Sequence, residues 1–218
     1  MKMLETTAAG AALAYEEIKQ GIIELRYPPG TKLSEVRLAE ELGCGRSPVR
    51  SAFARLRSEG WIEVSPQSGT YVRAPSEREI EEMFECRQLL EAHVARLAAL
   101  KMPPDEVKKL RAALRRLKPA GRAERNFADL SAFDSLLHAT LYRAAGNALI
   151  SGILLNLLEK AQWLKNCSPS GPRRMKLWSA ELERVLDAVE ERDAERAAET
   201  MREHIANASP QARARVVD

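Results

Sequence analysis

Helical periodicity covers most of the chain and is interrupted by one short β-like segment. Between residues 11 and 27, apolar side chains recur every three or four positions, which predicts a helix that buries Tyr15, Ile18, Ile22 and Leu25. The first ten residues are small and polar, and we expect them to form a frayed lead-in. Pro28, Pro29 and Gly30 end the predicted helix.

Residues 33–61 predict two short helices joined by a tight turn. Ser34 can cap the first helix and Gly43 ends it, and its apolar face consists of Val36, Ala39 and Leu42. The second helix is expected to start at Ser47, with Pro48 in the first helical position, where a missing N–H costs nothing. Its buried face consists of Val49, Phe53 and Leu56.

The opposite face of the second helix carries Arg46, Arg50 and Arg57. A helix of this length fits the major groove of B-DNA, which is about 12 Å wide, and arginine near its N-terminus can reach guanine edges or phosphates. The alternative interpretation is a solvated basic face on an ordinary helical hairpin. The next segment favours DNA, because residues 62–72 form two short β-branched runs around a turn at 66–69. These elements together predict a winged helix-turn-helix.

A short linker at 73–75 separates this domain from a second one. Ser76 and Glu79 form an S-x-x-E capping box, and every later segment has helical period, which predicts a bundle of about six or seven helices. Asp193 is expected to cap the last helix, which should end before Pro210. Breaks that contain proline or glycine separate the helices at 102–104, 119–121, 146–147 and 168–172. The predicted fold is therefore mainly α, with a winged helix-turn-helix in 1–75 and an all-helical domain in 76–218.

The composition of the chain excludes some classes of protein but does not identify a function. The formal net charge is +3 and the pI about 8.8, which is too weakly basic to indicate nucleic-acid binding without the clustered arginines. Cys44, Cys86 and Cys167 show no C-x-x-C spacing, so neither a disulfide framework nor a zinc finger is indicated. No apolar run reaches the roughly 18 to 20 residues that cross a bilayer, and acidic residues stand where a signal peptide would be apolar. We expect a cytoplasmic protein without a membrane partner.

Residues 18–72 resemble the N-terminal domain of GntR-family transcription regulators. The stretches YPPGTKLSEVRLAEELG (27–43) and GRSPVRSAFARLRSEGWIE (45–63) match the family's pattern nearly throughout. Residues 77–208 resemble the all-helical, FCD-like effector domain of the FadR-type branch. The resemblance implies a DNA-binding transcription regulator rather than an enzyme. It also implies a homodimer on a palindromic operator, with repression relieved by a small organic acid, commonly a carboxylate.

The resemblance also implies which residues meet DNA. Arg46 and Arg50 would contact bases or phosphates, and Arg57 would add charge. Backbone contacts would come from Ser47 and from the wing residues Ser68, Gly69 and Thr70. The chain departs from the family at two positions: Val36 replaces a common arginine, with Arg37 about 100° further round the helix, and Gly45 replaces a serine or threonine. The contact made from position 36 is therefore lost or shifted to Arg37.

Asp134 and His138 stand four residues apart, so both project from one helix face. They could share a metal ion, and the alternative is an ordinary Asp–His hydrogen bond. The resemblance implies a divalent metal such as zinc, held by this pair and two later histidines. His204 matches one of them, but Leu182 stands at the other and falls on an apolar stripe. We therefore expect a weakened or absent metal site, with Asp134, His138 and His204 lining an effector pocket.

Arg87 matches an arginine that the family directs at this pocket, where a guanidinium could bind an effector carboxylate through two hydrogen bonds. The alternative is an ion pair with Glu91, four residues later.

Two other functions would use parts of this sequence. A metal-dependent hydrolase could use Asp134, His138 and His204, but spacing identifies no general base. An architectural DNA-binding protein would rarely need a large helical second domain.

Overall fold

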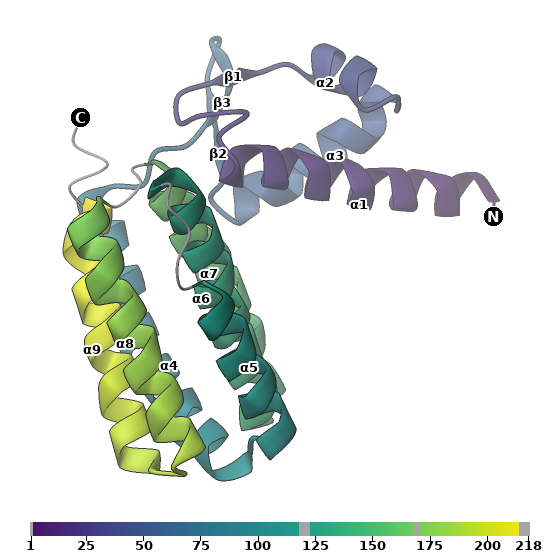
Figure 1. The fold of residues 1–218 in the computed structure, drawn as a ribbon. Helices are drawn as coiled ribbons and strands as arrows, with labels where there is room; N and C mark the ends of the chain where they lie inside the picture. Colours follow the sequence, from purple (N-terminus) through teal and green to yellow (C-terminus); the bar gives the residue numbers. More distant parts are fainter. Residues whose placement is uncertain (1, 118–122, 168–170, 214–218) are drawn as a thin grey trace. The chain divides into compact units, whose positions relative to one another are not determined.

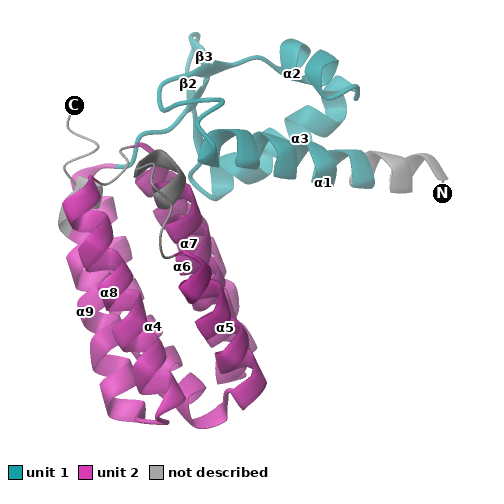
Figure 2. Cartoon of the chain, in the orientation of Figure 1, with its two compact units in different colours: residues 1–75 teal, residues 76–218 magenta. Residues whose placement is uncertain are grey.

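A computed structural model describes residues 2–117, 123–167 and 171–213 of the chain (Figure 1). The chain divides into two compact units, Met1–Pro75 and Ser76–Asp218, here unit 1 and unit 2 (Figure 2). The division falls at the linker and capping box recognised in the sequence. The fold is mainly α, as predicted. No helix among the described residues is long and apolar enough to span a membrane.

Unit 1 combines three helices with a small antiparallel sheet. The helices are α1 (Lys2–Ile23), α2 (Glu35–Glu41) and α3 (Arg46–Ser58). The strands are β1 (Lys32–Leu33), β2 (Ile62–Ser65) and β3 (Gly69–Val72), in the order β1-β3-β2. Ile62 pairs with Val72 and Ser65 with Gly69, so the predicted wing is confirmed. The short strand β1 was not foreseen.

In the core of unit 1, α3 packs against α1 and against β2. Fully buried side chains from these three elements include Tyr15, Ile18, Ile22, Val49, Leu56 and Ile62. The predicted apolar faces of α1 and α3 are thus confirmed, apart from Leu25, which lies beyond α1 with a positive φ of 62°. The expected frayed lead-in is wrong, because α1 begins at Lys2.

Two further details of the helix-turn-helix differ from expectation. α3 begins at Arg46 after the extended residue Gly45, not at Ser47. Pro48 is then the third helical residue, and this still costs nothing because the first four N–H groups of a helix have no intrahelical partner. In α2, Leu38 and Ala39 are buried whereas Val36 is exposed, because this two-turn helix turns only that edge toward α3.

Unit 2 is a bundle of six helices among its described residues. They are α4 (Glu77–Lys101), α5 (Pro104–Arg116), α6 (Ala123–Ala145), α7 (Ala148–Cys167), α8 (Pro172–Glu190) and α9 (Ala194–Arg213). α4 contacts α6, α7, α8 and α9 and so forms the centre of the bundle. Ser76 and Glu79 make the predicted capping box at its start.

The predicted breaks between these helices are largely confirmed. α4 ends before the prolines at 103 and 104, and Gly146 follows α6 with a φ of 72°. The break at 119–121 and part of that at 168–172 lie outside the described residues. The carboxylate of Asp193 accepts from the Arg196 N–H at 3.0 Å, as a cap should. The expected end before Pro210 is wrong, because α9 continues to Arg213; a proline this near a helix end removes one backbone hydrogen bond while the preceding turns pack on α4.

We predict that Ser76→Ala destabilises unit 2 by about 1 kcal/mol, because the Ser76 hydroxyl accepts the Glu79 N–H and no other side chain replaces it. Urea unfolding followed by circular dichroism measures the change. Ser76→Asp should restore most of the stability, since a carboxylate accepts the same bond. An unchanged unfolding midpoint in Ser76→Ala would show that the capping box contributes nothing.

Candidate functional site

The exposed face of α3 presents the arginines that the sequence singled out. Arg46, Arg50 and Arg57 are all solvent-exposed, while Val49, Phe53 and Leu56 on the other face are buried. Arg46 is the first residue of the helix and Arg50 lies one turn later. Both guanidinium groups therefore lie where a helix N-terminus would meet an anionic ligand.

Glu35 at the start of α2 pairs with both of these arginines. Its carboxylate accepts hydrogen bonds from Arg50 Nε at 3.3 Å and from Arg50 Nη2 at 3.0 Å. Arg46 Nη2 lies 4.0 Å from the same carboxylate. The hydrogen bonds raise the pKa of the Arg50 guanidinium. The Arg50 guanidinium is thus already oriented by the Glu35 carboxylate. A phosphate or guanine edge would have to compete with Glu35 for these hydrogen bonds.

The remaining predicted contact residues lie around this helix and on the wing. Arg37 is exposed on α2 and donates to Glu41 at 2.8 Å. Ser47 is exposed in the first turn of α3, although it is not the cap. On the wing, Ser68 shares a 2.6 Å hydrogen bond with the Tyr71 hydroxyl, and Gly69 adopts a φ of 133° that favours glycine. Thr70 is half-buried.

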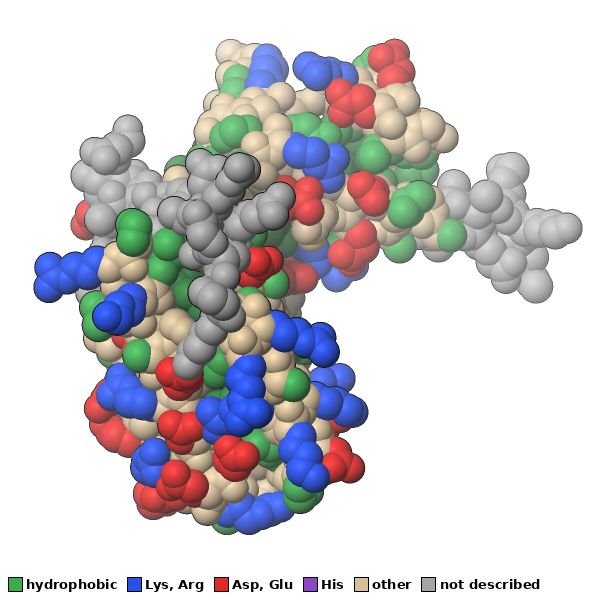
Figure 3. Space-filling view, viewed as in Figure 1, with side chains coloured by type: hydrophobic (Ala, Val, Ile, Leu, Met, Phe, Trp, Pro, Cys, Tyr) green, Lys and Arg blue, Asp and Glu red, His purple; other side chains and the backbone are tan. Residues whose placement is uncertain are grey.

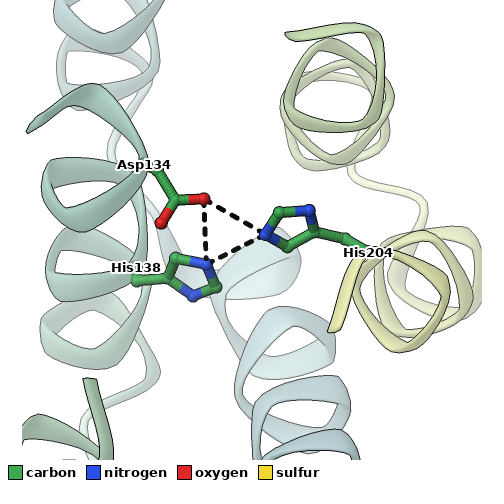
Figure 4. A group of neighbouring side chains, drawn as sticks. All are labelled: Asp134, His138 and His204. Carbon is green, nitrogen blue, oxygen red and sulfur yellow. Dashed lines mark hydrogen bonds and ion pairs between the residues drawn. The ribbon is translucent and has the colours of Figure 1, made fainter. Parts of the chain in front are cut away.

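A second candidate site lies inside unit 2, where Asp134, His138 and His204 converge (Figure 4). The first two come from α6 and the third from α9. The exposed fractions of the three residues are 3%, 0% and 3%, respectively. Asp134 Oδ1 lies 3.7 Å from His138 Nε2 and 3.2 Å from His204 Nε2, and the two nitrogens are 3.3 Å apart. The structure therefore brings together all three predicted ligands.

His138 is held from its other side by a buried ion pair on α4. Its Nδ1 contacts Glu91, whose second oxygen accepts from Arg87 Nε at 2.6 Å. Burial raises the pKa of Glu91, but the charges of Arg87 and His138 outweigh it and lower the pKa to about 2. Burial lowers the pKa of His138, but the charges of Glu91 and Asp134 raise it to about 9 overall. Arg87 and Glu91 therefore form the ion pair that was the alternative to effector binding by Arg87.

His204 has a matching arrangement on α8. Its Nδ1 lies 3.2 Å from Glu181, whose carboxylate also accepts two hydrogen bonds from Arg174, at 2.8 and 3.1 Å, and one from Asn207 at 3.0 Å. Burial raises the pKa of Glu181, but the hydrogen bonds from His204 and Arg174 lower it overall. Leu182, the next residue, is fully buried in the apolar core and cannot act as a ligand.

Asp134 is fixed by two donors from neighbouring helices. The Trp178 indole donates to Oδ1 at 2.8 Å, and Lys165 donates to Oδ2 at 2.8 Å. Burial raises the pKa of the Asp134 carboxyl, but the charges of Lys165 and His138 hold it well below its ordinary value. Asp134 is therefore a carboxylate that turns one oxygen toward both histidines.

The cluster fits a metal ion by the chemistry of its donors. Nδ1 of each histidine faces a carboxylate, which favours the tautomer that leaves Nε2 unprotonated and free to bind a metal. Zinc ligands lie about 2.0–2.1 Å from the metal, so tetrahedral ligand atoms are about 3.3 Å apart. The separations of 3.2 and 3.3 Å that involve His204 fit this spacing, and the 3.7 Å separation is slightly long. Without a metal, a protonated His138 supplies the positive charge between the carboxylates of Glu91 and Asp134.

Sequence reasoning missed four of the residues that surround these ligands. They are contributed by α4, α7 and α8: Glu91, Lys165, Trp178 and Glu181. Glu91 carried a weak signal as the ion-pair partner of Arg87. The other three gave none, because their contacts depend on how separate helices align. His93, the remaining histidine, is exposed on α4.

A winged helix with exposed arginines joined to a separate helical bundle is the architecture of a DNA-binding transcription regulator. Residues 11–72 match the bacterial regulatory proteins of the gntR family, and residues 82–207 match the FCD domain. The chain belongs to the GntR family of transcription regulators, in the branch that carries an FCD domain.

Individual relatives agree with this assignment. The chain is 35% identical over 146 residues to an uncharacterised HTH-type regulator of Agrobacterium vitis, covering 64% of this chain and 83% of the relative. It is 25% identical over 202 residues to the HTH-type transcriptional repressor RspR of Escherichia coli, covering 91% and 87%.

Solved structures show the same fold. A putative GntR regulator from Rhodococcus aligns with a TM-score of 0.75 at 19% identity, covering 93% of this chain and 96% of that one. Escherichia coli McbR/YncC aligns with a TM-score of 0.76 at 21% identity, covering 93% and 98%.

We predict that Glu35→Gln raises the affinity for non-operator DNA several-fold, because it frees Arg46 and Arg50 to bind phosphates. The plot of log affinity against log salt should become steeper by up to about 1 unit. Fluorescence anisotropy with a random-sequence duplex at several salt concentrations measures both effects. Glu40→Gln, which removes an equal charge from an exposed position of the same helix, is the control. Identical behaviour of the two variants would contradict a role for Glu35.

Proposed function

We propose that this regulator is a sequence-specific repressor that binds a palindromic operator as a homodimer and is released by a small organic acid. The observation that carries the DNA half of the proposal is the exposed arginine face at the start of α3, built on a buried apolar face. The effector half rests on the buried Asp134, His138 and His204 cluster.

The arginines suit base readout in the major groove. Arg46 and Arg50 are exposed at the start of α3, and a guanidinium is the commonest donor to the two acceptors of guanine. Arg57, Arg37 and the wing residues 68–70 would add phosphate contacts that fix the register of the helix without reading bases. One such helix reads only a few base pairs, so a two-fold pair of chains on a palindrome supplies the missing specificity.

The internal cluster suits a divalent metal such as zinc. Asp134, His138 and His204 would hold it, and bound metal would supply a cationic centre that attracts a carboxylate. Because a core leucine stands at the expected fourth ligand, the ion would bind more weakly than in a four-ligand site and keep positions open to water or an effector carboxylate. Arg87 lies one ion pair away from His138 and would respond to a change in its charge.

The proposal of repression rests on the name of one relative and on the usual behaviour of such regulators. RspR is a transcriptional repressor, and this chain aligns with most of its length. For an acid to release DNA, it must bind two arrangements of the dimer with different affinity. The linker at residues 73–76 is the segment through which a change in unit 2 would reach unit 1.

The regulators of this family are not enzymes, and the cluster gives hydrolysis little support. A hydrolytic metal site usually includes a positioned general base beside the metal-bound water, and a carboxylate is a common one. The three carboxylates around the histidines are each engaged by a cationic side chain: Asp134 by Lys165, Glu91 by Arg87 and Glu181 by Arg174.

We predict that Arg46→Ala and Arg50→Ala each weaken operator binding by roughly 10- to 100-fold, because each removes a contact worth about 1–3 kcal/mol. The operator is first selected from random-sequence duplexes with the full-length protein, and gel shift then measures affinity. Arg78→Ala, which removes an exposed arginine from unit 2, is the matched control. Wild-type affinity in both α3 variants, with unchanged circular dichroism, would refute DNA reading by this helix.

We predict that zinc raises the thermal unfolding temperature of the wild-type protein but not of Asp134→Asn or His204→Ala. Metal that binds only the native state stabilises it by about 2.7 kcal/mol at 100 times its Kd. Differential scanning fluorimetry with zinc alone, after chelation and dialysis, measures the shift. His93→Ala, which removes an exposed histidine, should keep the shift. An equal shift in the site variants would place zinc elsewhere, and stoichiometric metal that survives chelation would contradict weak binding.

A further inference from the structure

The helices α6 and α7 form an antiparallel pair with one side left outside the core. Ser151 on α7 donates to the Tyr142 carbonyl, and Gln162 further along accepts from Ser131, so the two helices run in opposite directions. Successive residues of an α-helix are rotated by about 100° around its axis. Ser135 on α6 and Ser151 on α7 each contact the other helix. The next residue along each helix, Leu136 and Gly152, is therefore rotated to the same outer side of the pair.

This outer side is apolar and exposed. We call it the α6–α7 face and define it by Leu136, Leu149, Gly152, Ile153, Leu155 and Asn156. Its four large side chains have exposed fractions of 47% (Leu136), 76% (Leu149), 45% (Ile153) and 47% (Leu155). Elsewhere among the described residues of unit 2, exposed leucines occur singly or three turns apart, at positions 89, 100 and 177. A clustered apolar patch of this kind is typical of a protein interface.

The face also lacks charge. Residues 148–158 contain no charged side chain, although charged residues make up 30% of the chain. On α6 the ionisable groups between Asp129 and Arg143 are Asp134, His138 and Tyr142, and all three are buried, so exposed charges stand only at the two ends of this stretch. By contrast, lysine, arginine and acidic side chains are interspersed over the part of unit 2 that is visible in Figure 3. Removing an apolar, uncharged helix face from contact with water is energetically favourable.

We propose that the α6–α7 face is where two copies of this chain pair, which rests on the proposed function of a dimeric regulator. Near a two-fold axis each residue meets its own copy, so a charged side chain would meet a like charge. The uncharged stripe avoids this repulsion.

Gly152 provides a second reason for an identical partner. A Cβ built at this exposed helical position meets no described atom within 4 Å, so nothing that the structure describes around it requires glycine. Glycine weakens a helix relative to alanine, and its missing side chain lets a second helix approach closely. Leu149 and Leu155 lie one turn before and after it, so two α7 helices that cross at Gly152 would bring apolar side chains together on both sides of the axis.

The first experiment places charge on the face. Leu149→Glu with Ile153→Glu should convert the protein from twice the 24.3 kDa chain mass to the single chain mass in sedimentation equilibrium. Affinity for the selected operator should fall by about 100-fold, because two half-sites are then bound independently. Leu177→Glu, at a similarly exposed leucine of α8, should remain dimeric. Circular dichroism confirms that each variant is folded.

The outcomes separate this inference from the proposed function. A double variant that stays dimeric, or a wild-type protein that is monomeric with and without operator, would overturn the interface. A monomeric variant that keeps full operator affinity would support the interface and contradict the need for a dimer in DNA reading.

A second variant tests the face without adding charge. Gly152→Cys in a Cys86→Ser background should form a disulfide-linked dimer on mild oxidation, because the two copies of residue 152 would meet at the axis. Leu177→Cys in the same background should not. Equal cross-linking of both variants, or none at residue 152, would overturn the proposed pairing.

Discussion

The helical unit depends on the requirement that charges taken out of water be paired. Three carboxylates lie around the two buried histidines, and each is matched by a cation: Asp134 with Lys165, Glu91 with Arg87, and Glu181 with Arg174. These partners come from α4, α6, α7 and α8, and α9 adds His204 and Asn207. Removing one partner of a buried pair leaves an uncompensated charge, which is strongly destabilising. Five of the six helices are therefore positioned by a single polar network inside an apolar core.

The same network connects the candidate ligand atoms to these five helices. A cation between Asp134 and the two histidines would change the field at Glu91 and Glu181 and, through them, at Arg87 and Arg174. Because interiors are close-packed, such a change is shared among helices rather than absorbed locally. The DNA-binding unit is simpler, since the first two arginines of α3, Arg46 and Arg50, share one ion-pair partner, Glu35.

Local rules were sufficient for much of the fold. Periodicity and turn residues gave the helix-turn-helix and the wing, the Ser76 capping box gave the start of α4, and i, i+4 spacing gave the Asp134–His138 pair. They failed where neighbouring structure decides: proline at the third position allowed α3 to start one residue earlier, and Val36 turned outward on a two-turn helix. The residues that orient the histidines belong to other helices, and the spacing of one helix carries no information about the register between helices.

Trp178 gives the buried cluster an optical property. Its indole N–H donates to the Asp134 oxygen that faces both histidines, and the Lys165 ammonium lies 5.3 Å from the centre of its ring. The emission of an indole depends on its hydrogen bond and on nearby charge, so any change of charge in the cluster would act directly on a chromophore that the chain already contains. The unmodified protein thus carries a fluorescent side chain in direct contact with its buried histidine cluster.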